Sequence, residues 1–401
     1  MQTLTPTAVR LNNLSGSAAD LDDSPDAPDG SWCTRLGATT AQCVTNAAYV
    51  SARGTWETNM VNYGEDHATY LAGGASQNEK LEAVYYDGQW IFQQIATYLN
   101  ETTPWTTAAE NARIVYIENY CEPTFNAQGY RRFPHGPYFD WLASGNSTIA
   151  DIQKLRDNPS FSALSEYAGA YLGSNQNMSR EMCYALQANI YAEKAGETRK
   201  TDSSVSRPGK FVEWAENHFR QWKEADYEPE DPAPRFAPFM AGLWLHALSE
   251  WVDWEEENDR DPNATWTGHT WANIDTMFGD FLVWMRDTAL VRDGTNVGQR
   301  MYLSSGGEYV FRYQDVGSDG DQAPAWDLNN LIGYSYAWYA NRIKATDPTE
   351  AQELMETADE LFIGAALNGY FYGAKQYNEL MRLSFKYVAI HDASGLGYCT
   401  S

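Results

Sequence analysis

The sequence predicts an all-α protein, an (α/α) toroid or incomplete barrel of helical hairpins with a few short β-hairpins in its loops. Apolar residues recur at helical spacing through most of the chain after residue 78. Prolines stand near the expected helix starts, where a missing N–H costs nothing. Consecutive helices of similar length recur without the strict sequence period that α-solenoids show, which favours the toroid.

Residues 78–100 show the helical pattern first, because Leu81, Ile91 and Ile95 fall on one stripe. The next helix is expected to begin with Thr106 or Thr107 as its N-cap. Further helices are expected at residues 148–172, 178–195, 208–224, 236–257, 269–290, 324–344, 348–367 and 371–390. A β-pattern is found only at 299–314, where Gly306 and Gly307 permit a tight hairpin turn.

The first 55 residues differ from the rest of the chain. They are rich in Ser, Thr, Ala, Asp and Gly, and the stretch DDSPDAPDG at 22–30 is typical of turns. We therefore expect residues 1–55 to form an N-terminal extension or partly ordered segment, and residues 56–401 to form the catalytic toroid. The extension resembles the start of modules found in viral and phage structural proteins.

The charge of the chain excludes several classes of partner. Asp and Glu total 54 against 28 Lys and Arg, which gives a net charge of −26. Such a surface repels phosphate backbones and anionic membranes, so neither nucleic acid nor a membrane is expected as a partner. The sequence contains no run of 18 apolar residues, so no transmembrane helix is predicted. We expect a monomer that is secreted or periplasmic, with its signal peptide not contained in this sequence.

The cysteines do not predict a metal site. None of the five lies in a CxxC pair and no His cluster accompanies them, so neither zinc nor another cofactor is expected. Cys33 and Cys43 close a short loop and are the candidates for a disulfide.

Two polar residues interrupt apolar helical stripes. Asn189 lies among apolar residues of the helix at 178–195, and His246 lies beside Trp244 in the helix at 236–257. A buried polar group without a hydrogen bond costs about 1–3 kcal/mol. Either both groups are satisfied within the core or both point into a central cleft.

Three further groups combine cations with aromatic residues, a pattern that suits an anionic sugar. The loop at 128–142 contains Tyr130, Arg131, Arg132, His135 and Tyr138. The segment at 298–317 contains Arg300, Tyr302, Tyr309, Arg312 and Tyr313. The last group comprises Lys375, Tyr377, Asn378, Lys386, Tyr387 and His391. Trp244 and Trp326 are further candidate residues for binding a sugar ring.

These residue types suit metal-independent β-elimination of a uronic-acid polymer. The substrate carboxylate opposes carbanion formation at C5, so the enzyme has to neutralise it with Asn, His or Arg donors. A base then removes the C5 proton and an acid protonates the departing O4, and tyrosine serves both roles when nearby cations lower its pKa.

The layout over residues 75–395 resembles the (α/α)-toroid polysaccharide lyases, and is most similar in size to the family-38 alginate and glucuronan lyases. The resemblance implies Asn189 and His246 as carboxylate neutralisers and Arg300 or Arg312 as a helper. It implies a catalytic tyrosine among Tyr302, Tyr309 and Tyr313. The Asn-Asn-His motif of another toroid alginate-lyase family is absent, because WDLNN at 326–330 has no following His.

Two alternatives remain open. An (α/α) glycoside hydrolase needs two carboxylates, and Glu250 with Asp253, or Asp140 with Asp327, are candidates. A non-catalytic carbohydrate-binding protein of a virus or a cell surface fits the N-terminal segment and the aromatic residues, but does not call for polar residues in the middle of helices.

Overall fold

The computed structural model describes residues 40–124, 127–157, 177–202, 205–224, 236–264, 271–287, 302–303, 309–310 and 325–398. These residues are overwhelmingly helical, which confirms the predicted all-α class. The first half contains α2 (Thr40–Ala72), α3 (Gln77–Ala83), α4 (Gly88–Leu99), α5 (Trp105–Arg113), the π-helix η2 (Ile114–Cys121), α6 (Glu122–Thr124), η3 (Gly129–Arg131), α7 (His135–Ala143), α8 (Ile149–Asp157) and α10 (Asn177–Lys194). The second half contains α11 (Arg207–Glu224), α12 (Pro238–Glu257), α13 (Ile274–Asp287), η4 (Trp326–Leu328), α14 (Asn329–Ile343), α15 (Pro348–Asn368), α16 (Ala374–Met381) and α17 (Ser384–Ser394).

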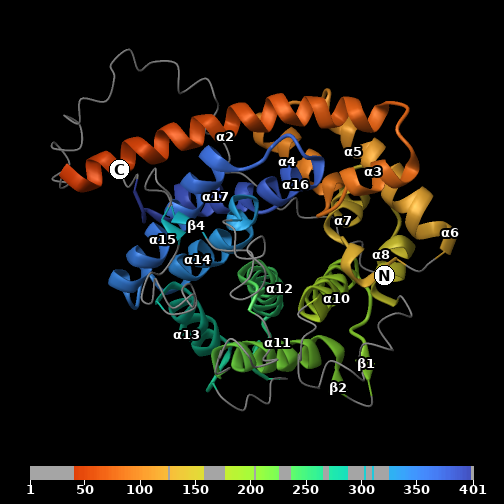
Figure 1. Cartoon of the computed structure of the whole chain (residues 1–401). Helices are drawn as coiled ribbons and strands as arrows, with labels where there is room; N and C mark the ends of the chain where they lie inside the picture. The colour runs from red at the N-terminus through yellow and green to blue at the C-terminus, as the bar shows by residue number, and fades with distance from the viewer. Residues whose placement is uncertain are drawn as a thin grey trace, which may run out of the picture.

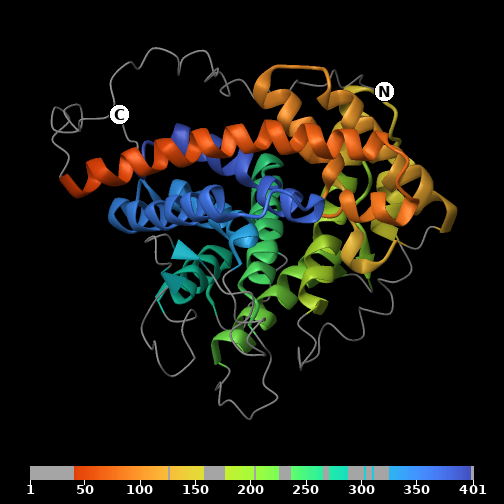
Figure 2. The same cartoon turned by 45° about the horizontal axis from the view of Figure 1, so that its top comes forward.

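Helix α12 lies at the centre of the molecule. Figure 1 looks nearly along its axis and shows the other helices around it, and Figure 2 shows it upright in the middle. It packs against α10 on one side and α14 on the other, and α14 in turn packs against α15 and α17. The long helix α2 crosses the outside and packs against α5 and α15. Within the described residues, no helix has both the length and the hydropathy to cross a membrane.

Two short β-hairpins interrupt the helices. Strands β3 (Tyr302–Leu303) and β4 (Tyr309–Val310) pair antiparallel, which confirms the hairpin expected at 299–314. A second hairpin, β1 (Thr201–Asp202) with β2 (Val205–Ser206), was not expected. The disulfide predicted between Cys33 and Cys43 falls outside the residues whose side chains the structure describes.

Several predicted boundaries are corrected by the structure. The helix expected at 78–100 is two helices, because Tyr86 and Asp87 adopt positive φ angles of 63° and 72° between α3 and α4. The helix expected at 371–390 is likewise divided into α16 and α17. Helix α5 begins at Trp105, with Pro104 rather than a threonine at the N-cap position.

The predicted domain boundary at residues 55/56 lies inside α2. Tyr49 and Ala52 are buried in the same apolar core as Trp56, so the helix continues the folded domain on the N-terminal side of this boundary. The low helical periodicity of this polar segment explains why α2 was missed from the sequence.

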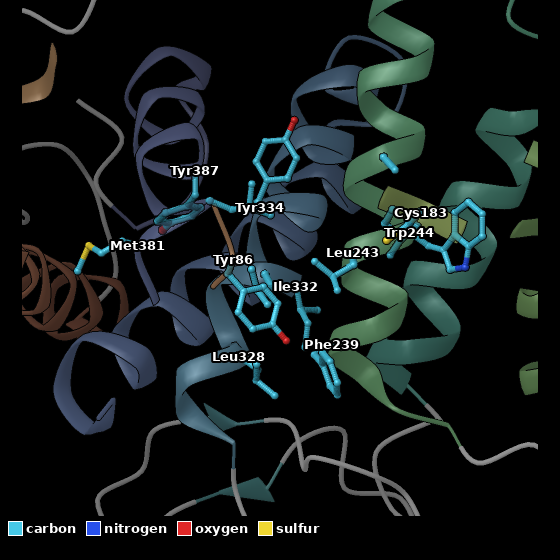
Figure 3. Close-up of a cluster of buried hydrophobic side chains, with 14 of the residues drawn as sticks. Tyr86, Cys183, Phe239, Leu243, Trp244, Leu328, Ile332, Tyr334, Met381 and Tyr387 are labelled. Atoms are coloured by element: carbon cyan, nitrogen blue, oxygen red, sulfur yellow. The ribbon is translucent and has the colours of Figure 1, made fainter. Parts of the chain in front are cut away.

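The apolar core fills the space between α12 and its neighbours. Figure 3 shows Leu243 of α12 directed toward Ile332 of α14, whereas Trp244 points to the other side of α12. All three side chains are at most 1% exposed. Full burial of each such side chain contributes about 1.5–3 kcal/mol. The burial on both sides explains why α12 lacks a polar solvent face over most of its length.

The close approach of α12 and α14 depends on Gly242, where an added Cβ would lie 2.6 Å from the backbone oxygen of Leu331. We expect Gly242→Ala to lower the free energy of unfolding by about 1–3 kcal/mol, because the two helices have to move apart. Gly54→Ala in α2 is the matched control. A Cβ there meets no atom within 4 Å, so the better helix former should raise stability by about 0.5–1 kcal/mol. Urea unfolding measures both, and equal effects of the two substitutions would contradict the close contact.

Candidate functional site

His135 is the first residue of α7 and is fully buried. Its Nδ1 lies 2.9 Å from Oδ2 of Asp87, and its Nε2 lies 3.0 Å from Oε1 of Glu250 on α12. Asp87 also accepts a hydrogen bond from the N–H of Gly136. Asp87 has a positive φ angle and lies between α3 and α4. Its carboxylate orients the imidazole of His135. The ring of Trp90 stacks on that of His135 at a centroid distance of 4.2 Å.

Glu250 is the centre of this polar cluster, and its side chain is 4% exposed. Donors from three other helices and from its own surround its carboxylate: Lys386 Nζ at 2.8 Å, Tyr191 OH at 2.8 Å, Gln187 Nε2 at 2.9 Å, His135 Nε2 at 3.0 Å and His246 Nε2 at 3.2 Å. Burial opposes ionisation, but the Lys386 ammonium and the hydrogen bonds donated to the carboxylate outweigh it and hold the pKa of Glu250 well below its usual range.

A chain of hydrogen bonds selects the tautomer of His246. Arg382 donates to Oε1 of Gln187 at 3.2 Å, so the amide nitrogen of Gln187 faces His246 and donates to its Nδ1 at 2.9 Å. The proton of the neutral ring is consequently on Nε2, which faces Glu250. Burial lowers the pKa of His246 to about 3, in agreement with a neutral imidazole.

The atoms of His135, His246 and Glu250 that could ligate a metal ion lie within 4.8 Å of one another. A metal would need an unprotonated Nε2 on His246, whereas the Gln187 amide leaves the proton there. The Lys386 ammonium also lies 3.3 Å from this nitrogen and 2.8 Å from Glu250. The arrangement thus provides a positive charge through lysine and does not favour a metal ion at this position.

Lys386 connects the buried cluster to solvent. Its side chain is 29% exposed, in contrast to 0% for His246. The ammonium lies 5.3 Å from the ring centre of Trp90 and 5.6 Å from that of Tyr334. The hydroxyl of Tyr334 is within 3.2 Å of Ser249 Oγ, and burial raises the pKa of this phenol well above its usual range. Lys386 is therefore the group of this cluster that a ligand can reach.

Asp253 lies one turn after Glu250 on α12 and is half-buried. It accepts a hydrogen bond from Nε1 of Trp338. Burial raises the pKa of Asp253 to about 6, although Trp338 and Lys386 favour its charged form. Two carboxylates with opposite pKa shifts on one helix face are an acid–base pattern.

Gln187 and Tyr191 were not selected from the sequence, although a signal for them exists. Arg180, Tyr184, Gln187 and Tyr191 recur on α10 at intervals of four, three and four residues, which places them on one helix face. This polar stripe is as regular as an apolar one. Asn189 is not part of this stripe. It was predicted because it is an isolated polar residue in an apolar stretch, and not because it belongs to a polar periodicity.

Among the predicted site residues, the structure brings together His246 and His135, whose ring centroids are 5.6 Å apart. Tyr138 lies next to them, because its ring packs edge-on against that of Tyr191 at 5.0 Å.

Three predicted residues are placed elsewhere. Asn189 is buried and donates to the carbonyl oxygen of Ala185 on its own helix. Trp244 is buried and donates to Nδ1 of His218 at 3.2 Å. Arg132 is also fully buried, and burial lowers its pKa to about 9. None of the three is exposed to a ligand, so their assignment to the site is corrected.

The remaining predicted residues fall into three sets. Tyr302 and Tyr309 are placed on β3 and β4, but their side chains lie outside the described residues. Arg300, Arg312 and Tyr313 lie entirely outside them. Trp326 is half-buried at the start of η4.

Tyr130, Arg131 and Lys375 gather around Tyr85, away from Glu250. The guanidinium of Arg131 is 5.7 Å and the ammonium of Lys375 is 5.5 Å from the Tyr85 ring centre. Arg180, at the start of the α10 stripe, lies 5.2 Å from the ring centre of Tyr130. The two clusters thus lie at opposite ends of one helix face.

A scan against protein-family models and searches of the curated proteins and the solved structures find no match to this chain.

Proposed function

We propose that this chain is a polysaccharide lyase that cleaves an anionic uronic-acid polymer, such as alginate or glucuronan, by metal-independent β-elimination. The observation that carries the proposal is Lys386, whose side chain is partly exposed and whose ammonium is held by a buried carboxylate in a chain with a net charge of −26. A fixed cation beside aromatic rings suits the carboxylate of a sugar acid and stabilises the charge that develops at its C5–C6 unit.

The arrangement of helices supports the finer fold assignment that we also propose, an (α/α) toroid. The polar faces of α10, α12 and α17 converge on Glu250, as the inner helices of a toroid would. We likewise propose a secreted or periplasmic monomer as the working form.

Within this proposal Lys386 neutralises the substrate carboxylate. Glu250 and His246 are positioning residues, because the Glu250 carboxylate accepts from the ammonium, His246 lies against that carboxylate, and neither is exposed. The base that removes the C5 proton and the acid that protonates O4 are assigned to the tyrosine that the resemblance implies, Tyr302, Tyr309 or Tyr313. Tyr334 is a poor base because of its buried, high-pKa phenol.

One observation favours a second candidate, an (α/α) glycoside hydrolase. Asp253, with a pKa of about 6, has the property of a general acid, and the ionised Glu250 has that of a nucleophile or base. Against it, five donors already occupy the Glu250 carboxylate, which weakens its basicity and blocks access to a sugar carbon. The lyase therefore agrees better with the contacts.

The two functions are distinguished by mixing the protein with a panel of polyuronates. The lyase should produce a new ultraviolet absorbance, because elimination creates a double bond conjugated with the carboxylate. New reducing ends without this absorbance would identify the hydrolase. Retention on a polysaccharide gel with neither product would indicate a binding protein and contradict both enzyme proposals. Asp253→Asn should preserve the lyase activity and abolish a hydrolase activity.

A further inference from the structure

We propose a second, separate carboxylate-binding subsite, formed by Arg180, Arg131 and Lys375 around Tyr85 and Tyr130, which binds a uronate residue remote from the cleaved bond. This inference rests on the proposed function, because it takes the substrate to be an extended polymer of sugar acids.

Arg180 is the central cation of this subsite. Within the residues that the structure describes, it forms no ion pair, and its buried Nε has no hydrogen-bond partner. Its guanidinium lies over the Tyr130 ring at 5.2 Å. A half-buried guanidinium without a carboxylate partner is costly. An incoming carboxylate that pairs with it in the fork geometry of arginine would recover this cost.

Arg131 and Lys375 approach the same aromatic pair. Arg131 lies 5.5 Å from the ring centre of Tyr130 and 5.7 Å from that of Tyr85. Its Nε also has no hydrogen-bond partner, while its terminal nitrogen pairs with Glu82. Lys375 is 44% exposed and lies 5.5 Å from the Tyr85 ring centre. Cations from three helical elements, η3, α10 and α16, thus lie near the stacked rings of Tyr85 and Tyr130.

The acidic residues nearby do not cancel this positive charge. Glu379 lies 3.6 Å from Lys375, and burial raises the pKa of Glu379 to about 7, so its charge is only partial at neutral pH. Burial also raises the pKa of Glu181, next to Arg180. Glu82 pairs with one terminal nitrogen of Arg131. The subsite is therefore cationic in a strongly acidic chain.

The position of Arg180 relative to Gln187 sets the distance between the two sites. Seven residues of α-helix span about 10 Å, which exceeds the length of one sugar ring. Tyr184 lies between them, because Arg382 contacts both Tyr184 at 3.4 Å and Gln187 at 3.2 Å. A polymer can occupy both ends of the α10 stripe, whereas a single sugar acid cannot.

The test uses Arg180→Gln, which keeps the size of the side chain but removes its charge. We expect KM for a polyuronate to rise about tenfold or more with kcat nearly unchanged, because the subsite binds substrate without contacting the reacting atoms. Lys375→Gln should raise KM by a smaller factor, since its side chain is more exposed. Arg220→Gln, at an exposed arginine of α11 paired with Glu224, is the matched control and should change neither constant.

Binding is measured separately from cleavage by titrating alginate and glucuronan oligosaccharides, and neutral oligosaccharides of equal length, into the wild-type protein and the Arg180→Gln variant. If the Arg180→Gln variant binds the acidic oligosaccharides more weakly and the neutral ones equally well, the subsite is supported. This holds even if no polyuronate is cleaved, because the absence of cleavage overturns only the lyase. If both the Arg180→Gln and Lys375→Gln variants cleave a polyuronate with the wild-type KM and bind the oligosaccharides with the wild-type affinity, the subsite is overturned and the lyase proposal remains.

Discussion

Glu250→Gln is expected to lower the free energy of unfolding by about 3 kcal/mol at neutral pH, because it removes the one negative charge on which Lys386, His135 and His246 converge. The amide keeps the shape of the carboxylate, so the loss reports charge and hydrogen bonding and not a cavity. Urea unfolding followed by tryptophan fluorescence measures it.

The pH dependence of this effect has a definite sign. The pKa of Glu250 is depressed in the folded state, so its contribution is fully present above the unfolded-state pKa of about 4.3 and is lost as the pH falls through the lower folded-state value. The stability difference between wild type and Glu250→Gln should therefore shrink below about pH 4. A difference that stayed constant down to about pH 2 would contradict an ionised Glu250.

Asp253→Asn on the same helix is the matched control. Its folded-state pKa of about 6 exceeds the ordinary value of 3.8, so its charge destabilises the fold increasingly as the pH rises through this window. Removing the charge should leave stability at neutral pH unchanged or higher, and the asparagine oxygen can still accept from Trp338. The two isosteric changes thus have opposite expected signs.

Lys386→Met is expected to reduce kcat of the proposed lyase about 100-fold to 1,000-fold, because the cation that stabilises the developing charge is lost. Methionine retains an unbranched side chain over Trp90, and Glu250 keeps its other four donors. The fold should therefore survive, which near-ultraviolet circular dichroism can verify. Initial rates on a polyuronate, with KM and kcat separated, provide the measurement.

Lys344→Met is the control for this substitution. Lys344 bonds the carbonyl oxygen of Ser394 at the far end of α17 and does not contact the Glu250 cluster. Wild-type kcat is expected for it. A Lys386→Met variant that folds and retains full activity would remove Lys386 from the reaction and leave Arg300 or Arg312, which the resemblance implies as a helper, as the next candidate for the cation.

Helix positions were largely predictable from the sequence. The expected ranges 178–195 and 348–367 correspond to α10 and α15 within one residue at each end, since long periodic stripes and an N-terminal proline are local signals. The break before α4 was not predictable, because the positive φ angles of Tyr86 and Asp87 are tied to the contact of Asp87 with His135.

The candidate site was only partly predictable. His246 and His135 were selected because each is unusual in its local context, whereas Glu250 entered with Asp253 as a carboxylate pair of the alternative hydrolase. The contact of His135 with Glu250 joins residues 115 positions apart. Asn189 and His246 looked alike in sequence, yet only His246 faces other helices' polar groups.

By itself, then, the sequence determined the all-α class, the acidic surface and the helical stripes, because periodicity and charge are local properties of the chain. The tertiary structure alone decided which polar groups meet. Whether a buried polar residue bonds its own helix, as Asn189 does, or joins a network, as Gln187 does, depends on which helix packs against it. That packing is set by contacts such as the one at Gly242, between residues far apart in the chain.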